Sequence, residues 1–117
     1  MLKNFVAFQQ AKKLYQLCKQ LRLPEMLRDQ LMRASASIAL NLAEGSGKRT
    51  PQDQRRFYGI ALGSVRECEA ILELETVEHL EIRKLLDSLG AMTYALSAPE
   101  PKKKHRPLGS KPDSNSN

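Results

Sequence analysis

The chain has 117 residues, of which 41% are hydrophobic and 27% are charged, a balance that fits one globular domain. No run of about 18 apolar residues occurs, so we expect no membrane span. Residues 1–10 do not combine a basic stretch with an apolar one, so no signal peptide is expected and the predicted location is the cytoplasm.

The net charge of +6 is unevenly distributed. Residues 1–66 hold 12 Lys/Arg and 4 Asp/Glu, a net of +8, whereas residues 67–98 hold 2 and 7, a net of −5. Residues 99–117 hold 5 and 2, a net of +3. This asymmetry suggests a face for an anionic partner, although a dipolar surface without a partner fits the charge equally well.

Cysteine and histidine give no sign of a metal site or a cofactor. Cys18 and Cys68 suit reduced thiols packed as small apolar residues. Neither His79 nor His105 has ligand-like spacing to them. We therefore predict no metal and no cofactor.

The first two predicted helices cover residues 4–22 and 24–44. Apolar residues recur at spacings of three and four in the first helix, at Phe8, Ala11, Leu14, Tyr15, Cys18 and Leu21. Another face of it carries Lys12 and Lys19, which we expect to meet solvent or a partner. The core stripe of the second helix is Leu27, Leu31, Ala34, Ile38 and Leu42. Gly45 is expected to end that helix as a left-handed cap.

The third predicted helix has the clearest start signal, a capping Thr50 followed by Pro51 and Asp53. It should run to about residue 76, with a core stripe at Phe57, Ile60, Ala61, Ser64, Cys68, Ile71 and Leu72. The fourth predicted helix covers residues 81–97, with apolar residues at Ile82, Leu85, Leu86, Leu89, Met92 and Leu96.

Four amphipathic helices joined by short connectors predict an all-α, antiparallel up-and-down four-helix bundle over residues 1–98. The composition then changes to a tail rich in Pro, Lys and Ser over residues 99–117, which we predict to be disordered. Its basic cluster, Lys102–Arg106, suits either a solubilising role or electrostatic contact with nucleic acid.

A polar row runs beside the core stripe of the second helix. Its members follow at i, i+4, i+8 and i+11: Arg33, Ser37, Asn41 and Glu44. Polar groups at the edge of a core need hydrogen-bond partners, so such a row predicts a fixed network or a packed protein interface. Catalysis is a poor alternative, because Glu44 is a lone acid without a neighbouring His, Cys or second carboxylate.

Basic residues gather around the connector between the second and third helices. Lys48 and Arg49 precede the start of the third helix, and Arg55 and Arg56 lie in its first turns. Cations beside a helix N-terminus attract phosphates, so these four residues, together with Lys12 and Lys19, are the candidate nucleic-acid-binding set. A solvated loop is the other interpretation, and the Walker phosphate-loop pattern fails because Gly47-Lys48 is followed by Arg49.

Two stretches of the chain resemble a known family. Residues 30–45 read QLMRASASIALNLAEG, and residues 55–67 read RRFYGIALGSVRE. They resemble the signature of four-helix-bundle proteins first noticed as reading frames in intervening sequences of bacterial 23S rRNA. That family also includes the accessory variability determinant, Avd, of diversity-generating retroelements.

The resemblance implies a four-helix bundle assembled as a homopentamer. For the retroelement branch it further implies a basic surface that binds RNA or DNA and a reverse transcriptase as partner. The residues that match the signature suit a structural network, whose candidate members are Arg33, Ser37, Asn41, Glu44, Gly45, Ser64 and Glu67. Five copies, each of net charge +6, would carry +30 in one assembly.

Two functions remain open at this point. The first is a non-enzymatic, pentameric nucleic-acid-binding protein that assists a reverse transcriptase or a structured RNA. The alternative is an intervening-sequence-type scaffold without a nucleic-acid role, whose basic half docks on an acidic protein surface or on the acidic half of another copy. An enzyme is not expected, because no nucleophile–base pair or metal cluster is visible in the sequence.

Overall fold

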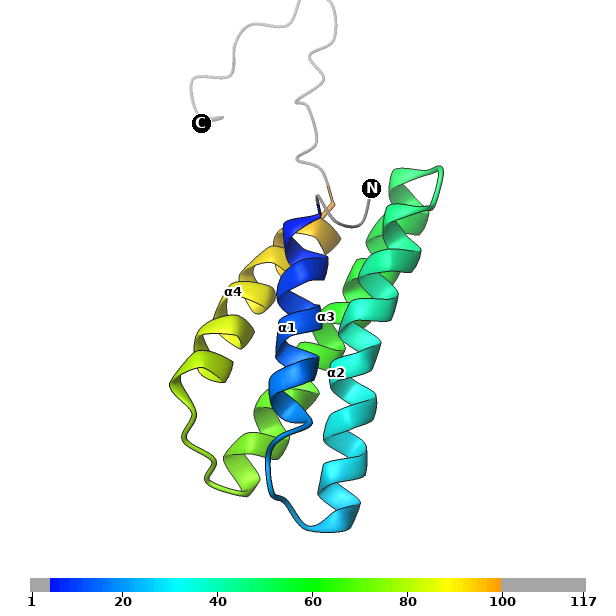
Figure 1. The fold of residues 1–117 in the computed structure, drawn as a ribbon. Coiled ribbons are helices and arrows are strands. Elements are labelled where there is room, and N and C mark those ends of the chain that lie inside the picture. The colour runs from blue at the N-terminus through cyan, green and yellow to red at the C-terminus, as the bar shows by residue number, and fades with distance from the viewer. Residues whose placement is uncertain (1–4, 100–117) are drawn as a thin grey trace, which may run out of the picture.

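The computed structural model describes residues 5–99, which form a bundle of four antiparallel helices (Figure 1). Their bounds are α1 (Val6–Cys18), α2 (Glu25–Ser46), α3 (Pro51–Leu74) and α4 (Leu80–Ser97). The helices pack in a ring in which α1 contacts α2 and α4, and α3 contacts α2 and α4. The predicted all-α bundle is confirmed, and residues 5–99 contain no strand. The predicted tail lies outside the described residues apart from Pro99.

The α2–α3 hairpin is the longest part of the bundle. Its connector reaches beyond the start of α1 and the end of α4, so the hairpin tip stands clear of the other two helices (Figure 1). The N-terminal end of α1 and the C-terminal end of α4 lie at this same end of the bundle (Figure 1). Among the described residues, the hairpin tip therefore extends past the ends of α1 and α4 (Figure 1).

The core consists of Leu, Ile, Val and Ala side chains, two cysteines and one tyrosine. Most of the predicted core positions are buried, but the prediction for Ile60 is wrong, since 44% of its surface is exposed. Tyr58 is buried at this level instead, and its ring meets Phe5 edge to face with centroids 6.4 Å apart. Each residue turns a helix by about 100°, so residues two positions apart, such as Tyr58 and Ile60, lie on nearly opposite sides. Burial of Tyr58 therefore turns Ile60 outward.

Gly45 corrects a second prediction. It is not a left-handed cap, because α2 continues through it to Ser46 and the C-cap residue is Gly47, with φ −91°. Its role is a close approach between helices. A Cβ atom at Gly45 would lie 2.7 Å from Tyr58 Cε1 and 3.2 Å from Phe57 Cβ. The missing side chain is what lets α2 and α3 pack tightly at this level.

The ends of α1 and α3 come earlier than predicted. After Cys18, the amides of Gln20 and Leu21 bond to carbonyls only three residues back, so the chain tightens into a turn that leads to α2. At the end of α3, the amide of Val77 bonds to the carbonyl of Leu72 and that of Thr76 to Glu73. This is a Schellman turn, and Thr76 takes its left-handed position with φ 51°.

The starts of α3 and α4 are both capped by side chains. Thr50 Oγ1 accepts a hydrogen bond from the amide of Asp53 at 3.1 Å, which confirms the predicted cap. His79 has the same function for α4, because its Nδ1 accepts from the amide of Ile82 at 3.2 Å. Near this cap, Lys13 of α1 forms an ion pair with Glu81, which ties α1 to the start of α4.

Candidate nucleic-acid interface and inter-helix polar network

The polar row of α2 joins α3 through a single hydroxyl pair. Ser64 Oγ donates to Ser37 Oγ at 2.8 Å, and Asn41 Nδ2 donates to the same oxygen at 3.0 Å and to the Ser37 carbonyl at 2.9 Å. Ser64 is buried, while Ser37 and Asn41 are half-buried at the edge of the core. Both donors converge on one acceptor, so the network fixes how α2 and α3 slide relative to each other.

The other predicted members of this network lie outside it. Glu44 forms an ion pair with Lys48 at 3.1 Å, and Gly45 contacts the Tyr58 ring as described above. Arg33 and Glu67 are exposed, and neither has a hydrogen-bond or ion-pair partner within residues 5–99. Arg33 lies one turn before Ser37 and Glu67 one turn after Ser64, so both continue the α2–α3 seam in the same direction.

Two large apolar side chains are exposed beside this seam. Leu40 of α2 is 66% exposed and Ile60 of α3 is 44% exposed. Gly63 is exposed on the same side of α3, and a Cβ there would meet no atom of another helix within 4 Å among residues 5–99. We refer to Arg33, Leu40, Ile60, Gly63 and Glu67 as the seam face. It combines apolar area, close backbone access and two unpaired opposite charges, which are features of a protein contact surface.

The predicted basic cluster is built around the ring of Phe57 at the hairpin tip. Lys48 Nζ lies 4.9 Å and Arg56 Cζ 4.5 Å from the centroid of that ring. Such cation–π contacts hold flexible cationic side chains near one another. Arg49 is exposed, and neither it nor the half-buried Arg55 has an ion-pair partner within residues 5–99. Lys48 and Arg56 therefore meet at one ring, and Arg49 and Arg55 lie at the same end of the bundle.

Two carboxylates reduce the net positive charge of this cluster. Glu44 pairs with Lys48, and Asp53 lies in the first turn of α3. At the helix N-terminus, the amide of Asp53 is engaged by Thr50 Oγ1 and that of Gln54 by the Thr50 carbonyl. The positive charge at this end consequently comes mainly from the cationic side chains.

Lys12 and Lys19 do not join the cluster. Both are exposed on α1 or at its end, and Lys19 Nζ lies 5.5 Å from the Tyr15 ring centroid. Lys19 precedes the start of α2, whereas Lys48 follows its end, and the 22 residues of α2 span about 33 Å at about 1.5 Å per residue. The six predicted cations therefore occupy separate places rather than one patch.

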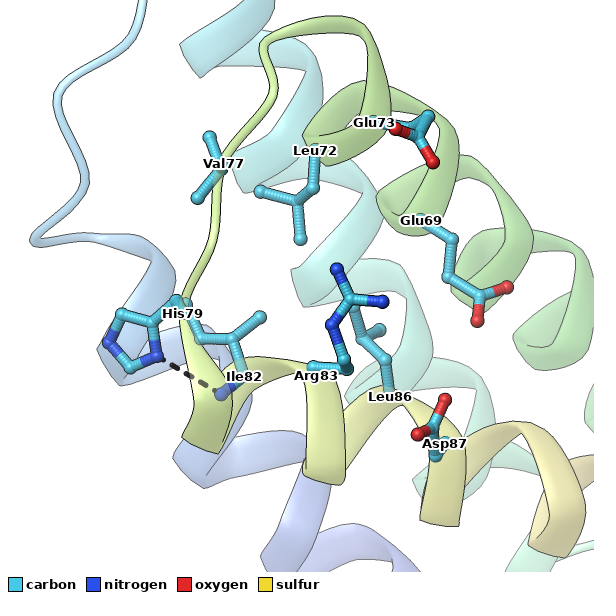
Figure 2. Close-up of a pocket in the computed structure, with 9 residues that line it drawn as sticks. All are labelled: Glu69, Leu72, Glu73, Val77, His79, Ile82, Arg83, Leu86 and Asp87. Atoms are coloured by element: carbon cyan, nitrogen blue, oxygen red, sulfur yellow. Dashed lines mark hydrogen bonds between the residues drawn. The ribbon is translucent and has the colours of Figure 1, made fainter.

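The sequence interpretation missed a cavity of about 210 Å³ between the end of α3 and the start of α4 (Figure 2). Its floor is apolar and is formed by Leu72, Val77, Ile82 and Leu86. The carboxylates of Glu69, Glu73 and Asp87 lie around it, and Arg83 reaches from α4 towards α3 (Figure 2). The negative charge of residues 67–98 was the available signal, but the Schellman turn that brings Val77 beside Leu72 could not be foreseen.

The two thiols are buried and unreactive in character. Cys18 and Cys68 have no exposed surface, and burial raises the pKa of Cys18 to about 11. Burial likewise raises the pKa of Cys68, with the charges of Cys18, Glu67 and Glu69 adding to the effect. No three His, Cys, Asp or Glu side chains gather as possible metal ligands in the part of the chain that the structure describes. None of the four described helices is both long and apolar enough to cross a membrane.

Comparison with known proteins identifies the relatives of this bundle. The family model of the 23S rRNA-intervening sequence protein matches residues 5–98, which include all four helices. A comparison with curated proteins gives no match. Because the family model spans the whole described bundle, this chain belongs to the family of 23S rRNA-intervening sequence proteins.

Proposed function

We propose that this protein is a non-enzymatic, cytoplasmic accessory protein that binds nucleic acid through the hairpin tip of α2 and α3. The observation that carries the proposal is the gathering of Lys48, Arg49, Arg55 and Arg56 there, two of them held against Phe57. The tip reaches past the ends of α1 and α4, so these two helices do not flank it (Figure 1). Contacts of this kind are directed at the phosphate backbone and carry little sequence preference.

The proposal includes assembly of several copies, a homopentamer, through the seam face. Leu40 and Ile60 supply exposed apolar area there, and Gly63 allows a close approach. Arg33 and Glu67 lack ion-pair partners within residues 5–99, so each suits the opposite charge of a neighbouring copy. In a ring, the hairpin tips of several copies would add their positive fields, which increases both affinity and association rate.

A reverse transcriptase or a structured RNA is the proposed working partner of the assembly. The resemblance to the retroelement accessory protein supports the polymerase, and the family of 23S rRNA-intervening sequence proteins supports an RNA context. The alternative is a scaffold that binds only other proteins. The exposed apolar side chains of the seam face favour that alternative if the hairpin tip proves inactive.

The experiment is a salt series of binding to labelled structured RNA and duplex DNA, using nuclease-treated protein. The test variant is Arg49→Glu/Arg55→Glu/Arg56→Glu, and the control is Arg22→Glu/Arg28→Glu/Lys84→Glu, which makes the same charge change at exposed residues elsewhere. If three phosphate contacts are lost, the plot of log K against log salt should become less steep by about 3 in the test variant only. Equal loss in both variants would mean that only net charge matters, and no binding by the parent chain would favour the scaffold.

Assembly is measured by light scattering on the same samples. A pentamer has five times the mass of the 13.2 kDa chain. Arg33→Glu should dissociate it, and the exchanged pair Arg33→Glu/Glu67→Arg should restore it if these two residues meet across copies. A parent chain that runs as a monomer would remove the assembly from the proposal.

A further inference from the structure

We propose that the cavity between α3 and α4 is a docking site for the basic C-terminal segment of the same chain, from Lys102 to Leu108. This inference does not depend on nucleic-acid binding. It concerns a different surface, formed by the C-terminal end of α3 and the N-terminal half of α4, away from the hairpin tip (Figures 1 and 2).

The shape and chemistry of the cavity call for a ligand that is both cationic and apolar. A volume of about 210 Å³ is below the roughly 300–1,000 Å³ of pockets for drug-sized molecules, so it suits one or two side chains. The floor is formed by four apolar residues, Leu72, Val77, Ile82 and Leu86. Leu72, Ile82 and Leu86 are at most 8% exposed, so an apolar occupant would cover mainly the half-buried Val77 and gain a limited contribution from burial, and the charge around the cavity supplies the main attraction.

The carboxylates around the cavity are available for a cation. Glu69 is engaged with Arg66 at 3.0 Å, but Glu73 and Asp87 have no ion-pair partner within residues 5–99. Among the described residues that line the cavity, Arg83 is the single Lys or Arg against three acids, so this lining is net negative. The wider segment 67–98 carries 7 Asp/Glu and 2 Lys/Arg, which extends the negative field beyond the cavity.

The C-terminal segment has the complementary chemistry. Lys102, Lys103, Lys104 and Arg106 supply four cations within five positions, and Leu108 is the single large apolar residue after Pro101. A cationic run followed by one apolar side chain matches an acidic border around an apolar floor. The rest of the bundle surface is net positive over residues 1–66 and would repel this segment.

The length of the chain after α4 allows the contact within one molecule. Asp87 and Arg83 lie 11 and 15 residues before Ala98, which is about 17–22 Å back along the helix at about 1.5 Å per residue. Lys102 and Arg106 follow Ala98 by 4 and 8 residues, a reach of about 13–27 Å at about 3.3 Å per residue. The cationic run can therefore return along α4 to the unpaired carboxylates, and Leu108 can reach the floor beyond them.

Paramagnetic broadening in the full-length chain tests the contact. A spin label attached through Ser110→Cys lies two residues after Leu108, and the native Cys18 and Cys68 have no exposed surface to compete for it. We expect the methyl signals of Val77, Ile82 and Leu86 to lose intensity when the label is paramagnetic. The intensity should return in high salt, in Glu73→Gln/Asp87→Asn and in Leu108→Ser.

Two controls decide between specific docking and general attraction. Glu25→Gln/Asp29→Asn removes the same two charges from exposed positions at the start of α2, and the broadening should persist in it. A mixture of isotope-labelled chains with unlabelled, spin-labelled chains reports contacts between copies. The proposal would be overturned if broadening appeared only in this mixture, because the contact would then be between copies. It would also be overturned if Glu73→Gln/Asp87→Asn and Glu25→Gln/Asp29→Asn lost the broadening equally, or if the cavity methyl signals of the spin-labelled chain kept their full intensity.

Discussion

Ser64 Oγ donates a hydrogen bond to Ser37 Oγ at 2.8 Å, although the two residues are 27 positions apart and lie on different helices. The same Ser37 oxygen accepts from Asn41 Nδ2 at 3.0 Å. The acceptor is thus shared by a donor from its own helix and one from the neighbouring helix. This arrangement links α2 to α3 at one register, beside the residues of the seam face.

Removing the inter-helix donor should weaken the bundle modestly. Ser64→Ala should lower the free energy of unfolding by about 1 kcal/mol, the usual net value of a hydrogen bond. The double variant Ser37→Ala/Ser64→Ala should cost less than the sum of the two single variants, because the residues interact directly. Urea denaturation followed by circular dichroism measures all three, and strict additivity would show that the pair contributes no coupling energy.

Two helical glycines should respond to alanine in opposite directions. At Gly59, a new Cβ would meet no atom of another helix within 4 Å among residues 5–99, so Gly59→Ala should stabilise the protein by about 0.8–1.0 kcal/mol through helix propensity. At Gly45, the new Cβ would lie 2.7 Å from Tyr58 Cε1, and overpacking costs about 1–3 kcal/mol. Gly45→Ala should therefore lower the melting temperature while Gly59→Ala raises it. A stabilised Gly45→Ala variant would mean that the Tyr58 ring moves aside freely.

The left-handed residue at the end of α3 offers a stabilising change. Thr76 has φ 51°, a conformation that costs about 1–2 kcal/mol for a residue with a side chain. Thr76→Gly should raise the free energy of unfolding by up to about 1 kcal/mol, since glycine relieves this strain but gives up some backbone entropy. Thr76→Ala keeps the Cβ and should gain much less. Chemical denaturation compares the three chains, and equal stability of the glycine and alanine variants would contradict the strain.

The ion pair between α1 and α4 should make stability depend on acid. The hydrogen bond and the charge of Lys13 hold the pKa of Glu81 below its ordinary value of 4.5. The unfolded chain then binds this proton more readily than the folded one, so the contribution is complete above pH 4.5 and is lost as pH falls through the folded pKa.

Denaturation midpoints measured between neutral pH and the acid range test this pH dependence. In Glu81→Gln, the decline of stability below pH 4.5 should be shallower than in the parent chain. Glu78→Gln is the matched control, because Glu78 is exposed nearby without an ion pair within residues 5–99, and it should leave the slope unchanged. High salt should reduce the difference between Glu81→Gln and the parent. Identical slopes in both variants would show that the pair does not persist in solution.

Local patterns explain what the sequence predicted well. The spacing of apolar residues gave four helices and most of the core, because burial of one face repeats every three or four residues along a helix. The start of α3 was also predictable, since Thr50, Pro51 and Asp53 form a cap from neighbouring residues alone. Composition likewise predicted the gathering of cations around residues 48–56 and of acids after residue 66.

Contacts between distant residues decided the rest. Whether Gly45 ends a helix or allows a close approach depends on the Tyr58 ring, which belongs to another helix. Ile60 and Tyr58 are both apolar, and only the packing of α2 and Phe5 against α3 determines which of them is buried. The polar row divides in the same way, with Ser37 and Asn41 joined to Ser64 and Arg33 left exposed.

The sequence by itself thus determined the helices, the class of fold and the sign of charge in each half of the chain, because these depend on residue type and on spacing within one helix. The tertiary structure decided which cations meet at Phe57, which polar residues form the network and where the acidic cavity opens between α3 and α4. Those features arise from the rotation and register of one helix against another, which are set by packing across the bundle rather than by any local pattern.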